Sequence, residues 1–164
     1  MSGRLLALLV AAGAAASCSS VPPLDSQFRS PDALAAAVLQ AVAANDRARL
    51  DRLALGEREF KDHVWPDLPA ARPERNLPFS YVWGDLHQKS NNRLVTRLGE
   101  HAGKQYRLRR IRFGDTTSYA HYRVHRDSVF DVVDASGMEA SLRLCGSFLE
   151  KDGVWKVFSY AVDD

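Results

Sequence analysis

The sequence carries no catalytic signature, no internal repeat and no spacing typical of metal ligands. His121 and His125 share a predicted strand face, but they lie about 13 Å apart at the usual rise per residue, too far to bind one ion together. The formal net charge of +2 over 164 residues argues against a chain-wide electrostatic design for nucleic acid. We therefore expect no metal, cofactor or nucleic acid, and no reaction can be named from the residues alone.

A hydrophobic run long enough to span a membrane is also missing from the start of the chain. The apolar run Leu5–Ala12 is too short to cross a bilayer and stay there. It follows Arg4 and precedes small residues, a layout typical of a secretory leader.

The end of this leader resembles the lipobox of bacterial lipoproteins, in which a cysteine becomes the lipidated first residue of the mature chain. The residues that carry the resemblance are Ala15, Ala16, Ser17 and Cys18, and Ala15 stands where Leu is usual. The resemblance implies a signal peptide over residues 1–17 and a lipid on Cys18. Ser19 after the cysteine implies the outer membrane, with the protein facing the periplasm. An uncleaved or ordinarily cleaved leader is the alternative.

Cysteine is limited to Cys18 and Cys145. A lipid on Cys18 would leave Cys145 without a partner in an oxidising compartment. No neighbouring motif marks Cys145 as a nucleophile. We therefore expect a buried, unpaired thiol on a strand.

Residues 31–164 have the composition of one globular domain, and residues 18–30, with Pro22 and Pro23, are predicted to be a tether. A helix is predicted over Asp32–Ala44, because Ser30 can cap it and Pro31 fits its first turn. A second helix is predicted over Asp46–Leu55, ended by Gly56.

The segment Glu57–Trp83 contains four prolines, which exclude a central strand or a long helix there. Its aromatic residues indicate that it packs on the domain, either as a crossover, which we favour, or as a lid. A third helix is predicted over Asn91–Ala102, capped by Ser90.

The last third of the chain alternates apolar and polar residues as strands do. Tyr106 and Leu108 lie at even-numbered positions of the first strand, whereas Ile111 and Phe113 lie at odd-numbered positions. Side chains alternate between the two faces of a strand, so an extra residue is needed to keep all four on one face. This predicts a bulge near Arg109 and Arg110. A hairpin turn is predicted over residues 134–137, and the last strand, apolar on both faces, is expected inside its sheet. The predicted strands are Tyr106–Phe113, Ser118–Arg126, Ser128–Val133, Ala140–Leu149 and a final strand over residues 154–160.

One strand face is too polar for the core and too aromatic for plain solvent surface. It is predicted to combine Ser141, Arg143, Cys145 and Ser147 with Tyr119, His121, Arg123 and His125. We expect this face to contact a ligand or a partner, most simply a second copy of the chain or an envelope protein. The residues expected to make that contact are Tyr119, His121, Arg123, His125 and Arg143.

Helices followed by an antiparallel sheet resemble the nuclear transport factor 2-like superfamily. The resemblance rests on the first helix, the Asn45–Arg47 break with Leu50 and Leu53 beyond it, and the closing Gly153–Val157. It implies an α+β fold in which N-terminal helices pack on a curved antiparallel sheet to form a cone, often with a pocket for a small ligand. It implies no reaction.

Two functions remain open: a non-catalytic binding or accessory module of the cell envelope, which we favour, and an isomerase- or cyclase-like enzyme that uses the cone pocket. The arginines at 107, 109, 110 and 112 either form a solvated face or contact anionic headgroups, an acidic polymer or a partner protein. An enclosed cavity with a carboxylate or histidine at its floor would favour the enzyme. Its candidate groups are Tyr119, His121, His125, Asp131, Asp134 and Tyr160.

Overall fold

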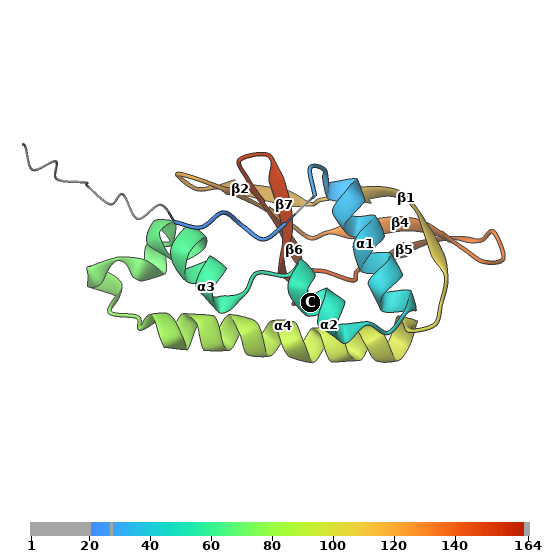
Figure 1. Ribbon diagram of the computed structural model, residues 1–164, viewed down its shortest axis with the longest axis horizontal. Helices are drawn as coiled ribbons and strands as arrows, with labels where there is room; N and C mark the ends of the chain where they lie inside the picture. Colours follow the sequence, from blue (N-terminus) through green and yellow to red (C-terminus); the bar gives the residue numbers. More distant parts are fainter. Residues whose placement is uncertain (1–20, 27, 163–164) are drawn as a thin grey trace, which may run out of the picture.

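The computed structural model describes residues 21–26 and 28–162. The chain is α+β, with helices along one side and two antiparallel sheets along the other, as Figure 1 shows. Within the described residues, no helix is both long and apolar enough to span a membrane.

The two N-terminal helices are confirmed. Helix α1 (Pro31–Ala43) begins where Ser30 Oγ accepts a hydrogen bond from the Ala33 amide at 3.2 Å. Helix α2 (Arg47–Leu53) begins where the Asp46 carboxylate accepts from the Arg49 amide at 2.9 Å. Helix α1 packs leucine, valine and alanine side chains, and α2 packs Leu50 and Leu53, into one buried core.

The proline-containing segment is a packed crossover built from short helical turns. These are α3 (Glu57–Glu59), the π-helical η1 (Phe60–Val64) and the 3₁₀ turns η2 (Trp65–Asp67), η3 (Pro69–Ala71) and η4 (Pro73–Arg75). Phe60 lies at the centre of an aromatic cluster, 5.3 Å from Trp83 and 6.1 Å from Phe79 between ring centroids. Gly56 does not end α2, which stops at Leu53, but precedes α3.

The predicted start of the third helix was wrong. Helix α4 spans Phe79–His101 and begins directly after Pro78, because a proline just before a helix interrupts none of its hydrogen bonds. Ser90 therefore lies inside the helix and does not cap it. Its hydroxyl accepts a hydrogen bond from the Tyr160 amide at 2.9 Å, which joins α4 to the end of the last strand.

The strands form two sheets, ordered β1-β4-β5 and β2-β3-β6-β7. Each neighbouring pair is antiparallel. Their bounds are β1 (Tyr106–Arg112), β2 (Asp115–Ser118), β3 (Arg123–Arg126), β4 (Val129–Asp134), β5 (Glu139–Leu142), β6 (Ser147–Lys151) and β7 (Val154–Ser159).

Three strand predictions are corrected. Ser118–Arg126 is not one strand, because the chain reverses at residues 119–122, where the Tyr119 amide donates to the Tyr122 carbonyl at 2.9 Å. Ala140–Leu149 is not one strand either, because it breaks at residues 143–146. The last strand lies at the end of its sheet, and bridges from Phe28 and Ala54 partly cover its outer edge.

The two sheets meet along a line that we call the crease, formed by residues 113–114, 127–128 and 143–146, where the chain passes from one sheet to the other. Single hydrogen bonds continue the pairing across it: the Gly114 amide donates to Arg126, and the Ser128 amide donates to Gly146. The backbones of Gly146 and Ala161 approach each other closely at the crease. A Cβ on Gly146 would lie 1.5 Å from the Ala161 carbonyl oxygen.

Cys145 lies in the crease, fully buried and free of a disulfide among the described residues. Burial raises the pKa of its thiol. This confirms that the thiol is buried, but Cys145 lies in the break between β5 and β6 and not on a strand as predicted. Cys18 lies outside the described residues, so the absence of a bond between the two cysteines stays a prediction.

The second half of the predicted tether contacts the domain. The Asp25 amide donates to Glu59 at 2.8 Å, and Ser26 Oγ donates to the Trp155 carbonyl at 2.6 Å. Glu59 in turn pairs with the buried Lys156 at 2.6 Å. Burial raises the pKa of Glu59, but hydrogen bonds from the Gly56 amide, from Lys156 and from the Asp25 amide outweigh it and leave that pKa below its ordinary value.

We predict that Gly146→Ala destabilises the domain by roughly 3 kcal/mol or more, because the Ala161 backbone must move to admit a methyl group. Gly84→Ala is the matched control: this glycine lies inside α4 with open space around its Cβ position, so alanine should stabilise by up to about 1 kcal/mol. Urea unfolding of both variants measures the difference. Equal stabilities would show that the close approach at the crease is not a constraint.

Candidate functional site

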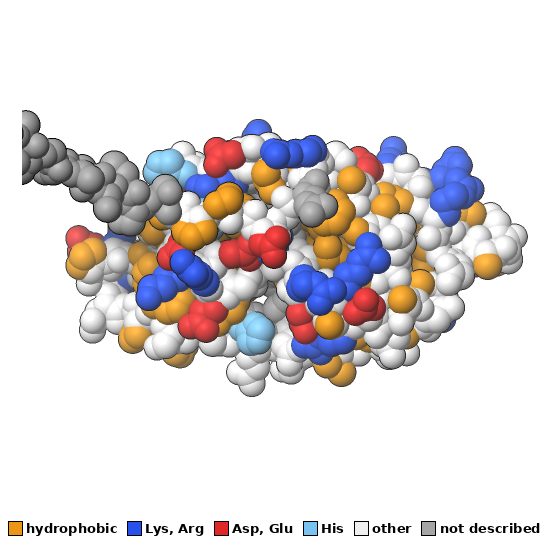
Figure 2. Space-filling model, in the orientation of Figure 1, with side chains coloured by type: hydrophobic (Ala, Val, Ile, Leu, Met, Phe, Trp, Pro, Cys, Tyr) orange, Lys and Arg blue, Asp and Glu red, His pale blue; other side chains and the backbone are white. Residues whose placement is uncertain are grey.

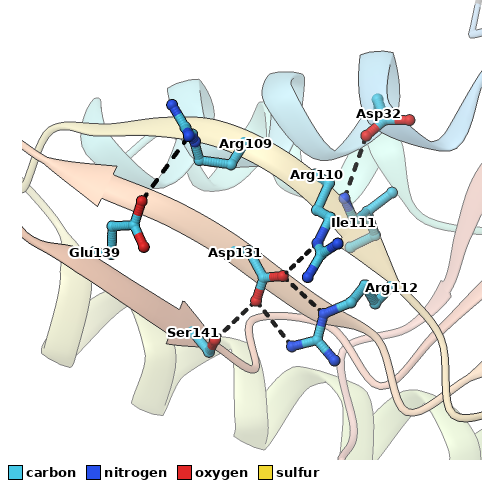
Figure 3. A network of polar contacts seen from close by, with 8 residues as sticks. All are labelled: Asp32, Arg109, Arg110, Ile111, Arg112, Asp131, Glu139 and Ser141. Carbon is cyan, nitrogen blue, oxygen red and sulfur yellow. Dashed lines mark hydrogen bonds and ion pairs between the residues drawn. The ribbon is translucent and has the colours of Figure 1, made fainter.

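The largest concentration of charge on the sheets is a groove on the outer face of β1, β4 and β5. Four arginines of β1 line it, together with Asp131 of β4 and Glu139 and Ser141 of β5. Its volume is about 910 Å³. Figure 3 shows the side chains reaching over the sheet from three strands. We call this the arginine groove.

A β-bulge explains why so many arginines of β1 share one face. The pairing of β1 with β4 shifts register between Leu108 and Arg110, which confirms the predicted bulge. Leu108 and Ile111 can then both pack on the core, while Arg109 and Arg110 both line the groove. The backbone of β1 is also held from the helical side, where Asp32 of α1 accepts from the Ile111 amide at 3.2 Å.

Asp131 is the centre of the groove. Its Oδ2 accepts from Arg110 Nε at 2.8 Å and from Arg112 Nε at 2.7 Å. Its Oδ1 accepts from Arg112 Nη2 at 2.9 Å and from Ser141 Oγ at 2.7 Å. Four donors therefore surround one carboxylate, and the side chains of Arg110 and Arg112 are held in place (Figure 3).

The hydrogen bonds from Arg112, then Arg110, then Ser141 hold the pKa of Asp131 far below its ordinary value. The same contact raises the pKa of Arg112. Asp131 thus stays an anion at physiological pH and is not suited to act as a general base.

Positive charge is left over in the groove. Its lining has four arginines against two carboxylates, Asp131 and Glu139. Arg109 lies 3.9 Å from Glu139, a distant pair with both side chains exposed, and Arg107 has no ion-pair partner among the described residues. Guanidinium groups fixed on a sheet can bind the oxygens of phosphate or carboxylate through paired N–H donors.

The structure does not bring the predicted polar face together on one sheet. Tyr119 and His121 lie in the β2–β3 turn, where Tyr119 stacks on Tyr122 and the His121 amide and ring both contact the Asp67 carboxylate at about 3.0 Å. Arg143 lies in the crease, and Ser141 belongs to the other sheet. The prediction failed because it missed the turn at 119–122 and the break at 143–146.

Arg123 and His125 do share a face of β3, and both bind Glu150 of β6, at 2.6 Å and 2.9 Å. The other ring nitrogen of His125 lies 3.0 Å from Thr116 Oγ1, and the ring stacks on Trp155 at 4.7 Å. Their polar groups are thus occupied within the domain. Contact of these residues with a partner stays a prediction.

The remaining candidate acid and base groups also have structural partners. Asp134 accepts from the Ser136 hydroxyl and from the Met138 and Ser136 amides in the hairpin turn, which lowers its pKa. Tyr160 is buried and donates to the Leu50 carbonyl at 2.7 Å, and burial raises the pKa of its hydroxyl. Within the described residues, no group of three or more metal-ligating side chains could hold an ion.

The arginines of the groove were identified from the sequence. The position of Asp131 and Ser141 beside them was not predicted. The predicted turn alone does not give this pairing, because counting back from residues 134 and 137 places Asp131 opposite Ala140. The structure instead pairs Asp134 with Met138 through a hydrogen bond of 2.9 Å, and this register places Asp131 opposite Ser141.

No protein-family model, curated protein or solved structure matches the chain.

We predict that Arg112→Gln raises the pKa of Asp131 toward its ordinary value of 3.8, because Arg112 is its strongest partner. A carboxylate whose pKa is lowered by folding adds stability above pH 3.8, and that stability is lost as pH falls through the lowered value. An NMR titration of the Asp131 carboxyl carbon measures the change. Arg107→Gln, which removes an equal charge from the same strand without touching Asp131, should leave the titration unchanged, and an equal shift in both variants would contradict the geometry.

Proposed function

We propose that the protein is a lipid-anchored binding module of the cell envelope, placed in the outer membrane with its domain facing the periplasm, and that the arginine groove binds phosphate groups of envelope molecules. The single observation that carries the binding role is the excess of positive charge in the groove: Asp131 is saturated by Arg110, Arg112 and Ser141, and Arg107 and Arg109 add two guanidinium groups against the distant Glu139 alone. The anchor is supported by the leader that ends at Cys18. The proposed fold is a nuclear transport factor 2-like cone, supported by the order of helices before antiparallel strands and by the bend between the two sheets.

A non-catalytic role fits the chemistry of the groove. Asp131 has no proton to give and little capacity to accept one, and Ser141 donates its hydroxyl proton to it. The interior between α1 and the sheets is filled by large side chains, among them the fully buried Phe130, Phe148 and Leu34. The isomerase- or cyclase-like alternative requires a carboxylate or histidine at the floor of a cavity in that interior, where these side chains now pack.

Phosphate is favoured because planar guanidinium groups match two of its oxygens at once, and because phosphates recur in both lipid headgroups and envelope polymers. The groove is open to solvent along the sheet, so it suits groups presented along a surface or a chain. A second copy of the chain or an envelope protein could still contact the domain elsewhere, through Arg123 or His125.

We predict that Arg107→Gln together with Arg109→Gln weakens binding of phosphate ligands by about tenfold or more, because each lost guanidinium removes a charge-assisted contact. Binding of soluble polyphosphate is measured by titration calorimetry, and binding of vesicles that contain an anionic phospholipid by co-sedimentation. Loss with vesicles alone identifies headgroups as the source, and loss with polyphosphate alone identifies a polymer. Arg72→Gln with Arg75→Gln is the matched control, since it removes the same charge from exposed turns η3 to η4. Equal weakening by both double variants would reject the groove.

We predict that wild-type protein incorporates labelled palmitate and that Cys18→Ala does not, because the thiol is the attachment point that the leader pattern indicates. Mass spectrometry of the mature chain gives its first residue. Equal incorporation by both proteins, or a mature chain that begins at another residue, would rule out the anchor.

A further inference from the structure

A second hollow lies on the helical side of the molecule, between α2, α4 and the end of β7. Its volume is about 540 Å³, and it is more enclosed than the arginine groove. Figure 2 shows a hollow in the middle of this face, above the long helix. Its inner wall is formed mainly by apolar and aromatic side chains: Leu55, Trp83, Leu86, Leu94, Phe158 and Tyr160.

The walls of this pocket are fixed from both ends. At one end, Phe60 packs against Trp83 and Phe158, at 5.3 Å and 6.2 Å between ring centroids, and holds α4 to the crossover. At the other end, the Tyr160 amide donates to Ser90 of α4, and its hydroxyl donates to the Leu50 carbonyl of α2. The pocket therefore exists before any ligand arrives, as binding sites for small molecules usually do.

Charge at the pocket disfavours an anion. Among the described residues that line it, Arg47 is the only arginine, and it is already bound to Asp51 at 2.9 Å and to Asn91. Glu57 adds a further carboxylate, so these described residues carry one more negative than positive charge when His87 is neutral. The net charge of this lining is thus opposite in sign to that of the arginine groove.

His87 supplies a hydrogen-bonding group. Its ring stacks on Trp83 at 5.2 Å, so its position is set from the same helix. Within the described part of the chain, no hydrogen bond engages either of its ring nitrogens. Most of the other polar groups of the lining have partners, and His87 can donate to or accept from a bound molecule.

We propose that this pocket binds an uncharged, largely apolar small molecule that carries one hydrogen-bonding group, with the apolar part against Leu86, Leu94 and Phe158 and the polar group at His87. The size of the pocket and its mixture of aromatic walls with a few polar groups are those of a small-molecule site. The site is independent of the phosphate binding proposed for the groove.

The test uses two fluorescent probes that differ by one sulfonate group. N-phenyl-1-naphthylamine is uncharged, has two aromatic parts and carries one N–H, and 8-anilinonaphthalene-1-sulfonate is its anionic counterpart. Purified full-length protein should bind the uncharged probe saturably at one site and the sulfonate at least about tenfold more weakly there. Binding to the apolar leader is common to every variant and cancels in their comparison.

Leu86→Trp should fill the pocket and weaken binding of the uncharged probe by about tenfold or more. Val95→Trp is the matched control, because Val95 is exposed on the same helix and lies outside the pocket. Thermal unfolding shows whether each variant is folded. Equal affinities of the two variants would overturn the site, as would the absence of saturable binding to the wild type.

His87→Phe keeps the ring stacked on Trp83 and removes the hydrogen bond, so it should weaken the uncharged probe by about fivefold. His87 is exposed, so this variant tests the site even if Leu86→Trp fails to fold. Unchanged affinity would reject the assigned role of His87. If Arg107→Gln with Arg109→Gln abolished binding of this probe, the probe would lie in the groove and the pocket would be rejected.

Discussion

The crease between the two sheets is the constraint on which the rest of the structure depends. Three segments of the chain bend along this line, at residues 113–114, 127–128 and 143–146. Each bend requires either a close approach of two segments or a positive φ, which most residues do not readily adopt. Gly114 would place a Cβ 2.9 Å from that of Asp127, Asp127 itself adopts a positive φ of 52°, and Gly146 lies against the Ala161 carbonyl. β1, β4 and β5 extend from the crease in one direction, and β2, β3, β6 and β7 extend from it in another. The bend therefore determines which side chains lie together on one face of the molecule.

The arginine groove follows from that bend together with the bulge in β1. The outer face of the three-stranded sheet is left uncovered, since α1 packs on its other side. A flat sheet would have continued the same face onto β2, β3 and β6, where Arg123 and His125 share Glu150. The crease separates an open, positively charged surface from a neutralised one.

Local features of the chain were predictable from the sequence, and features set by distant contacts were not. Ser30 identified the start of α1, because capping depends on a few neighbouring residues. The change in the alternation of apolar side chains after Leu108 identified the bulge in β1. The breaks at 119–122 and 143–146 were missed because the alternation of side chains continues through them, while the turn depends on the strand partners. The long helix from Phe79 was missed because its exposed middle has only a partial apolar stripe, and tertiary packing on Phe60 and Tyr160 stabilises it. For the site, the arginines were visible, but their common carboxylate required the strand register.

If Cys18 carries a lipid, the contact of Asp25 with Glu59, which is paired with the buried Lys156, would limit how far the domain can move from the bilayer. A lipid on Cys18 would be separated from that fixed point by seven residues, which span at most about 25 Å when fully extended. Asp25 would therefore stay within about 25 Å of the membrane surface, and the domain would meet molecules embedded in or emerging from that surface in preference to those deep in the periplasm. Loss of the Asp25–Glu59 contact would lengthen this tether without altering the arginine groove or the pocket between α2 and α4, since neither residue lines them.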